Sequence, residues 1–308
     1  MNKPEKVSYG GWDNCLKQGS DNVELIVTLN VGPRIIRFGI PGGQNLFKEF
    51  EDQMGMTSGD EWMSFGGHRL WHAPEVYPRT YAPDFDPVEY VWQNDILKLI
   101  QKTEPGTGIQ KEIEIRVEGN SVLLTHRLIN RNVWAVEIAP WCLSVMAPGG
   151  RAIIPQEEFR PHPDVLKPAR PLVLWHFTRM NDPRFTWGDR LIQLREDNQI
   201  NCKQKVGMLN TQGWAAYALG RDLFIKSISY INNKKYADMG CNCEFFTMPG
   251  FLEMETLGPL TKIEPDESIE HLERWWLIPD VELPKDEGPL IEAINLHLEN
   301  IGFTAFKV

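Results

Sequence analysis

The sequence predicts an all-β protein, built as a large antiparallel β-sandwich or barrel with a few short helices. Three observations favour this class. Apolar residues recur with period two in most segments, turns rich in Gly, Pro, Asn and Asp separate those segments, and helical patterns do not alternate with them. Alternating strands and helices would instead indicate a parallel α/β sheet. With 308 residues, 42% of them hydrophobic, we expect a single domain over residues 1–308.

The clearest strands form a hairpin over residues 109–129. Isoleucine and valine alternate there with glutamate and arginine up to Val117, and the Glu118-Gly119-Asn120 turn precedes a second extended run. Further strands are expected at Val23–Leu29, Arg34–Ile40, Val88–Trp92, Ile96–Gln101, Trp134–Met146, Leu172–Phe177, Gly213–Leu219, Leu223–Ile228, Phe251–Thr256 and Ile269–Ile278.

One helix is expected near the end of the chain, in the segment DEGPLIEAINLHLENIG. Pro289 suits a first helical turn, an apolar stripe follows it, and Gly302 lies where a helix would end. Residues Pro155–Pro171 form a proline-rich loop, and loops of this length inside compact domains are more often functional than not.

Charge and composition narrow the classes of partner. The net charge of −10 disfavours nucleic-acid backbones and anionic membrane surfaces, so a neutral small molecule is the easier ligand. Neither a signal-peptide pattern nor an apolar run as long as a membrane span is apparent. The five cysteines suggest free thiols in a reducing compartment. We therefore expect a cytoplasmic protein, and the sequence leaves its oligomeric state open.

The segment GGHRLWHAPE, Gly66–Glu75, concentrates hydrogen-bonding groups without a clean helix or strand pattern. His68 and His72 would be a metal pair on a helix, but the flanking glycines and proline argue against a helix, so no metal site is expected. As a loop between strands, the segment offers Arg69 as a multidentate donor and Trp71 as a stacking face. The alternative is that Arg69 pairs with Glu75 and that Trp71 is simply buried.

A second candidate segment is FLEMETLGPL, Phe251–Leu260. Period two places Glu253 and Glu255 on one face of a strand. Two adjacent carboxylates would raise the pKa of at least one if they are buried, which suits a general base. The alternative is a solvated edge with two surface acids. His162, in the proline-rich loop, is a weaker candidate for substrate binding, and no phosphate-binding loop or serine-hydrolase elbow is present.

With these two segments and the later HLERWWL, the sequence resembles the galactose-mutarotase-like superfamily, and in particular its aldose 1-epimerases. The likeness extends from NVGPRIIRFG to the strand Leu272–Ile278. It implies a large antiparallel sandwich, a supersandwich, with a sugar-binding cleft on one concave sheet. In that family an early arginine binds sugar hydroxyls, histidines act as acids or donors, and a glutamate on a late strand is the base.

By resemblance, Arg69 corresponds to the early arginine, His72 or His68 to the acid, and Glu255 to the base, with Glu253 as the competing position. Family members carry a His-x-Tyr-Phe-like signature on a central strand, whereas the comparable stretch here, APWCLSVMAPGG, has no histidine. The expected function is therefore an isomerase of the aldose 1-epimerase type that interconverts the anomers of a free sugar or sugar derivative. The mechanism needs no cofactor.

Three alternatives remain open at this point. One is a carbohydrate-binding protein without catalysis on the same fold. Another is glycoside hydrolysis or elimination with an acid from the 155–171 loop, although adjacent glutamates on one strand do not face each other across a bond. A sugar phosphate is also a possible substrate if Arg34, Arg37, Arg69 and Arg79 converge.

Overall fold

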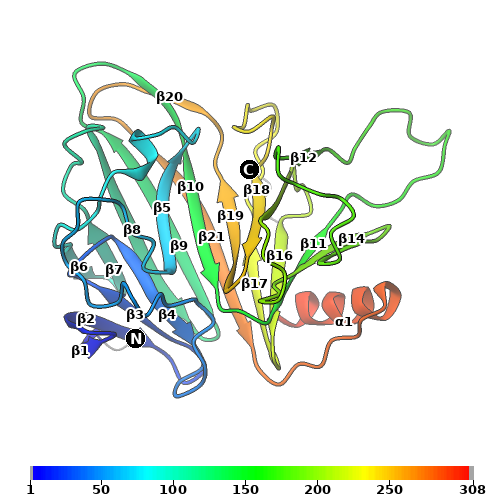
Figure 1. Ribbon diagram of the computed structural model, residues 1–308, viewed down its shortest axis with the longest axis horizontal. Helices are drawn as coiled ribbons and strands as arrows, with labels where there is room; N and C mark the ends of the chain where they lie inside the picture. The colour runs from blue at the N-terminus through cyan, green and yellow to red at the C-terminus, as the bar shows by residue number, and fades with distance from the viewer. Residues whose placement is uncertain (1–2, 305–308) are drawn as a thin grey trace.

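The computed structural model describes residues 3–304, and within this range two large antiparallel sheets account for nearly all regular structure (Figure 1). The predicted all-β sandwich is confirmed. The first sheet has 11 strands in the described chain and runs in the order β1 (Glu5–Tyr9), β2 (Trp12–Gly19), β3 (Glu24–Thr28), β4 (Arg34–Gly39), β5 (Gly67–Ala73), β10 (Val136–Met146), β19 (Phe251–Leu257), β18 (Cys243–Met248), β15 (Gln204–Met208) and β12 (Leu172–Leu174), with β20 (Thr261–Ile263) beside β10.

The second sheet has 10 strands among the described residues. Its order is β13 (Phe185–Trp187), β14 (Leu191–Arg195), β11 (Arg151–Pro155), β16 (Trp214–Leu219), β17 (Asp222–Ser227), β21 (Ser268–Ile278), β9 (Ser121–Asn130), β8 (Ile109–Glu118), β7 (Ile96–Ile100) and β6 (Glu89–Gln93). The predicted hairpin is the β8–β9 pair, in which Val117 faces Val122.

The core lies between the two sheets. The inward side chains of the strands interdigitate there, for example Leu70 and Met254 from the first sheet with Leu124 and Phe224 from the second. The predicted helix is α1 (Glu287–Asn300), and its buried residues Leu290 and Ile294 pack on a separate apolar cluster formed by β11, β14, β16 and β17. A short 3-10 helix, η1 (Arg79–Tyr81), follows β5.

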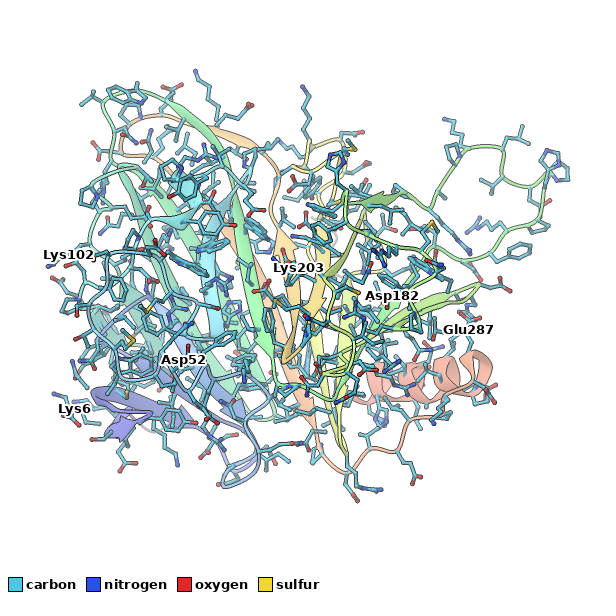
Figure 2. All side chains as sticks on the ribbon, viewed as in Figure 1. Lys6, Asp52, Lys102, Asp182, Lys203 and Glu287 are labelled. Carbon is cyan, nitrogen blue, oxygen red and sulfur yellow. The ribbon has the colours of Figure 1, made fainter. Side chains whose placement is uncertain are left out.

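Contacts at the first turn of α1 fix the helix to the sheet. The Glu287 carboxylate accepts backbone N–H groups of Asp189, Arg190 and Leu191 at 3.1, 2.9 and 2.8 Å. Figure 2 labels this side chain beside the helix. The proline-rich loop, residues 156–171, projects away from both sheets at the upper right of Figure 1 and is exposed along nearly all of its length. In the described chain, no helix is both long enough and apolar enough to span a bilayer.

The expectation of a loop over Gly66–Glu75 is wrong for most of that segment, because Gly67–Ala73 is strand β5 in the middle of the first sheet. Every residue of β5 is buried, so both faces of the strand are covered. The strand therefore lacks the alternation of polar and apolar residues that marks a half-exposed strand. The glycines before it are required by close backbone approach. A Cβ atom on Gly66 would lie 1.8 Å from the Lys48 carbonyl oxygen, and one on Gly67 would lie 2.3 Å from that of Ile35.

Candidate functional site

A cavity of about 320 Å³ lies on the outer face of the first sheet, over β5, β10, β19, β18 and β15. Strand alternation selects the side chains that reach it. On β5 these are Arg69 and Trp71, and on β19 they are Glu253 and Glu255. The remaining lining residues are Phe50, Trp62, Ser64, Glu75, Tyr81, Trp141, Leu143, Trp175, Phe177, Lys203, Lys205, Phe246 and Phe251. Figure 2 labels Lys203 beside β18 and β19.

Among the described residues, only one of the two carboxylate oxygens of Glu255 has hydrogen-bond partners. Its Oε2 atom accepts hydrogen bonds from Trp141 Nε1 at 2.9 Å and from Lys205 Nζ at 3.0 Å. Its Oε1 atom is buried and has no hydrogen-bond partner among the described residues. Leaving a buried carboxylate oxygen without a hydrogen-bond donor costs free energy. A proton or a hydrogen bond from a ligand would satisfy this atom.

Lys205 contacts a second carboxylate besides Glu255, that of Glu244. Its Nζ atom lies 2.7 Å from Glu244 Oε2, and it stacks over the rings of Trp175 and Trp141 at 4.6 and 5.1 Å. Burial alone would lower the pKa of Lys205, but the charges of Glu255 and Glu244 raise it above its ordinary value. The lysine is therefore a permanent cation next to Glu255.

Glu253 has a different environment from Glu255. It is 13% exposed and pairs with Arg69 Nη2 at 3.1 Å. Burial raises the pKa of Glu253, Arg69 counteracts this in part, and the neighbouring Glu255 charge adds to the rise. The pKa of Glu253 is thus raised, as expected for one of two adjacent buried carboxylates. The direction of this shift makes Glu253 the candidate proton donor.

The guanidinium of Arg69 is enclosed by aromatic rings. It stacks on Trp71 at 4.5 Å and on Trp62 at 5.1 Å, and its Nε and Nη1 atoms have no hydrogen-bond partner in residues 3–304. Trp62 Nε1 is also buried and unpartnered. Residues that line one cavity therefore hold three buried donors and one buried acceptor without partners, a pattern typical of a site for a polar ligand.

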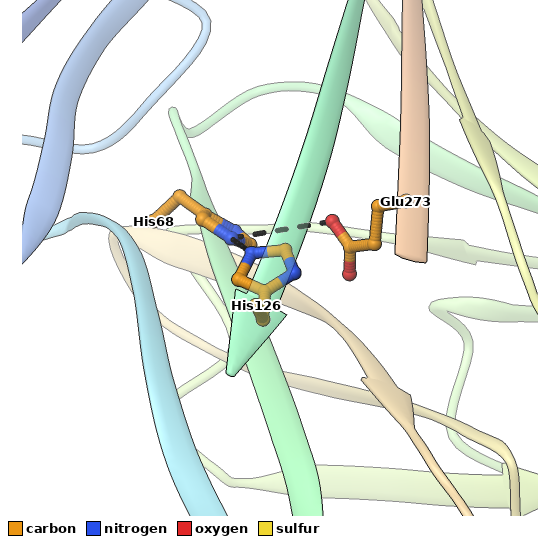
Figure 3. Close-up of side chains that lie close together, drawn as sticks. All are labelled: His68, His126 and Glu273. Atoms are coloured by element: carbon orange, nitrogen blue, oxygen red, sulfur yellow. Dashed lines mark hydrogen bonds and ion pairs between the residues drawn. The ribbon is translucent and has the colours of Figure 1, made fainter. Parts of the chain in front are cut away.

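A second polar cluster lies between the sheets, where His68 on the inward face of β5 meets His126 of β9 and Glu273 of β21 (Figure 3). His68 Nε2 is 2.8 Å from His126 Nε2, and Glu273 Oε2 lies 4.0 Å from His68 Nε2. The Glu273 carboxylate pairs with Lys226 Nζ at 2.9 Å and accepts Trp275 Nε1 at 2.8 Å. All of these residues are buried.

The hydrogen bonds of this interior cluster fix the positions of its protons. His126 Nδ1 donates to the carbonyl oxygen of His271 at 3.2 Å, so His126 Nε2 is an acceptor and His68 Nε2 is the donor. His68 Nδ1 then accepts from Ser144 Oγ at 2.9 Å.

The same reasoning extends the cluster in both directions. Ser144 Oγ accepts from Lys226 Nζ at 3.1 Å, and Thr256 Oγ1 donates to Glu273 while accepting from His271 Nε2 at 2.9 Å. Every member of the interior cluster therefore has a partner with all three histidines neutral.

Charge decides whether the interior cluster suits a metal ion. His68, His126 and Glu273 place ligand atoms close together, as do Cys142, His271 and Glu273. Burial lowers the pKa of His68, and although burial would raise the pKa of Glu273, Lys226 and the histidines hold it well below its usual range. The positive charge of Lys226 already balances the negative charge of Glu273. A divalent cation would therefore leave two uncompensated positive charges in the core. The donor set does not fit a metal.

No family model matches this sequence, and no curated protein sequence matches it either. Solved structures do resemble its fold. A TPR-domain containing protein from Parabacteroides distasonis aligns with a TM-score of 0.57 and 10% identity over 89% of this chain, which spans only 49% of that protein. A putative aldose 1-epimerase from Escherichia coli K12 aligns with a TM-score of 0.54 and 11% identity over 85% of this chain and 98% of its own.

A galactose mutarotase-like protein from Lactobacillus casei aligns with a TM-score of 0.53 and 9% identity, over 86% of this chain and its own full length. The chain has the galactose mutarotase-like fold. At these identities the likeness concerns the fold alone, so the chemistry must be argued from the residues of this chain.

Within this mutarotase-like fold, the cavity brings together five of the residues singled out in the sequence: Arg69, Trp71, Glu75, Glu253 and Glu255. The supposed Arg69–Glu75 pair does not form, because Arg69 contacts Glu253 and Glu75 accepts the Tyr81 hydroxyl. Trp71 is 6% exposed and packs on Arg69, Trp62 and Trp141, so it orients the arginine and offers little free stacking face.

The three candidate histidines do not reach the cavity. His68 and His72 lie on the inward face of β5, because alternation places them opposite Arg69 and Trp71. Burial lowers the pKa of His72 to about 3, so it stays neutral. His162 lies in the exposed proline-rich loop and is not among the cavity residues.

The four arginines considered for a sugar phosphate do not converge. Arg34 pairs with Asp84 at 2.6 Å, Arg37 pairs with Glu24 at 2.9 Å, and Arg79 donates to the Pro74 carbonyl. Arg69 alone of the four lines the cavity. Sequence reasoning missed Lys205, Glu244 and most of the aromatic lining. Lys205 and Glu244 lie on strands β15 and β18, which were not predicted, and nothing in the sequence around them signals a site.

Proposed function

We propose that this protein binds a free sugar or a close derivative in the cavity and interconverts its anomers by general acid and base catalysis. The observation that carries the proposal is the unpartnered Oε1 atom of Glu255, in a cavity lined by aromatic rings and by Arg69. Aromatic faces suit the C–H face of a sugar ring, and Arg69 offers two unused donor atoms to its hydroxyls.

In the proposed reaction Glu255 removes the proton from the anomeric hydroxyl, and the C1–O1 bond becomes a carbonyl as the C1–O5 bond breaks. Glu253 gives its proton to the ring oxygen O5. Rotation about the C1–C2 bond and reversal of both proton transfers close the ring on either face. Positioned proton transfers of this kind each contribute about 10²–10⁴-fold.

The roles follow from the two environments. Lys205 and Trp141 donate to Oε2 of Glu255 and leave its Oε1 atom as the acceptor for the anomeric proton. The raised pKa of Glu253 favours its protonated form. Histidines are replaced in this scheme by a second carboxyl group, because His68 and His72 face the core.

Exchange spectroscopy by NMR on a panel of reducing monosaccharides tests the proposal. We expect anomer interconversion above the spontaneous rate for at least one sugar, and a loss of about 10²-fold or more with Glu255→Gln. Glu49→Gln, which removes a carboxylate outside the cavity, is the matched control and should retain the rate. Absence of acceleration for every sugar would refute the catalytic function.

A carbohydrate-binding protein without catalysis is the second candidate. The lack of any histidine among the cavity residues favours it. Calorimetric binding of a sugar that persists in the Glu253→Gln, Glu255→Gln double variant, combined with no turnover by the parent protein, would support this second function.

A further inference from the structure

Four phenylalanine rings lie side by side in the lining of the cavity. Phe50, Phe251, Phe246 and Phe177 contact one another in this order, with ring centroids 5.4, 5.9 and 6.4 Å apart. All four line the cavity, and Phe177 is 41% exposed. We call this set the phenylalanine wall. Because it leaves apolar surface in contact with water, covering it would favour ligand binding.

The wall and the charged groups share strand β19. Phe251, Glu253 and Glu255 occupy alternate positions on the cavity face, so the first and the last are about 13 Å apart along the strand. A sugar ring built from bonds of about 1.5 Å is roughly 6 Å across with its hydroxyl oxygens. A single ring over Glu255 therefore does not reach the far end of the wall.

A second sugar ring would be a poor occupant of this end of the cavity. Each additional ring brings several hydroxyl groups, and burial of hydroxyls without partners is unfavourable. Four phenylalanine rings offer them neither donors nor acceptors, and the polar residues paired with Phe246 in the sheet, Lys205 and Glu253, already contact Glu255 and Arg69. An apolar group instead gains from both burial and aromatic contact.

We propose that the natural ligand is a sugar with an aryl or acyl substituent away from its anomeric carbon. The sugar lies over Glu253 and Glu255, and the substituent lies against the phenylalanine wall. The sugar half of this assignment rests on the proposed function, whereas the substituent half rests on the wall.

Titration calorimetry on the full chain tests the assignment with matched pairs of ligands: glucose, galactose and mannose, each with its 6-O-benzyl ether. We expect the benzyl ether of the preferred sugar to bind about tenfold or more tightly than the parent sugar, with a more negative heat-capacity change. Phe177→Ala and Phe246→Ala should remove most of this advantage, so that the ratio of the two affinities falls towards one.

Phe159→Ala is the control, because Phe159 is also exposed but lies in the proline-rich loop outside the cavity. Equal affinity for the parent and benzylated sugars would overturn the assignment, as would a benzyl advantage that survives both cavity variants. A larger gain for a disaccharide than for any benzyl ether would do the same. Binding is measured without turnover, so failure of catalysis leaves this test intact.

Discussion

The inward and outward faces of β5, β10 and β19 meet polar clusters that differ in how fully they are hydrogen-bonded. On the inward side, His68 of β5 joins His126, His271, Lys226 and Glu273 of the second sheet, and this interior cluster closes on itself with one cation balancing one anion. On the outward face, Arg69, Trp62 and Glu255 keep buried atoms without partners.

Adjacent residues illustrate the contrast. His68 belongs to the closed cluster and Arg69 to the open cavity, and Thr256 and Glu255 are divided in the same way. A closed network stabilises the fold and needs no ligand, whereas unpaired buried donors and acceptors are retained where a ligand satisfies them. Both ring nitrogens of His72 on the inward face also lack partners, but His72 is not among the cavity residues. Unpaired buried atoms therefore indicate a site where they coincide with a cavity, as on the outward face.

Breaking the buried charge pair should have the largest effect on stability. Glu273→Gln leaves the Lys226 ammonium uncompensated, so we expect the free energy of unfolding to fall by about 3–5 kcal/mol. Urea denaturation followed by tryptophan fluorescence measures this.

The control for that experiment is the Lys226→Met, Glu273→Gln double variant, which removes both charges. It should recover a substantial part of the loss, because no unpaired charge remains. Equal stability of Glu273→Gln and the parent protein would mean that the inward face is not a closed network.

Low pH should lower the free energy of unfolding, because the buried histidines between the two sheets are neutral in the folded protein. Burial lowers the pKa of His271 to about 3, as it does for His72. Below their ordinary pKa of about 6.5, these groups take up protons only on unfolding. The free energy of unfolding should therefore fall by about 1.4 kcal/mol per pH unit for each histidine between pH 6 and 4.

Denaturant titrations at several pH values measure this slope. Glu273 adds to it at lower pH, since its folded pKa is depressed and its stabilisation is lost as pH falls below about 4.3. His162→Gln, in the exposed loop, should leave the slope unchanged, and so should the addition of a sugar that binds the cavity. A flat profile from pH 7 to 4 would contradict the assignment of neutral buried histidines.

Removing a cation from the outward face should lower both activity and stability. In Lys205→Met the anomerisation rate should fall about tenfold or more, because Glu255 loses the ammonium donor that holds its Oε2 atom and orients the carboxylate. The rate measured by NMR shows the loss, and urea denaturation shows the accompanying fall in the free energy of unfolding.

Lys203→Met is the matched control for the loss of a cavity cation. Lys203 also lines the cavity, but within the described chain the ion pair to Glu255 is made by Lys205. An equal loss of rate in both variants would mean that general cavity charge, and not the Lys205 contact, supports catalysis.

Much of the fold could be predicted from local pattern. The alternation over residues 109–129 predicted β8 and β9 to within a residue, and α1 has Pro289 in its first turn and Gly302 just after its end, as expected. Strand β5 was missed because both of its faces are buried, which removes the period-two signal. Strand β15, which carries Lys205, is also buried throughout, and β18, which carries Glu244, lacks a regular alternation of polar and apolar residues.

By itself, the sequence determined which residues share a face: Glu253 with Glu255 on β19, and the apolar sets on each side of the hairpin, because side chains alternate along any strand. Only the tertiary structure decided which face is the cavity and what each carboxylate meets there. Lys205 lies 50 residues from Glu255 in the chain, and Arg69 lies 184 residues from Glu253. Contacts across such separations depend on how strands pair, and local sequence does not encode that pairing.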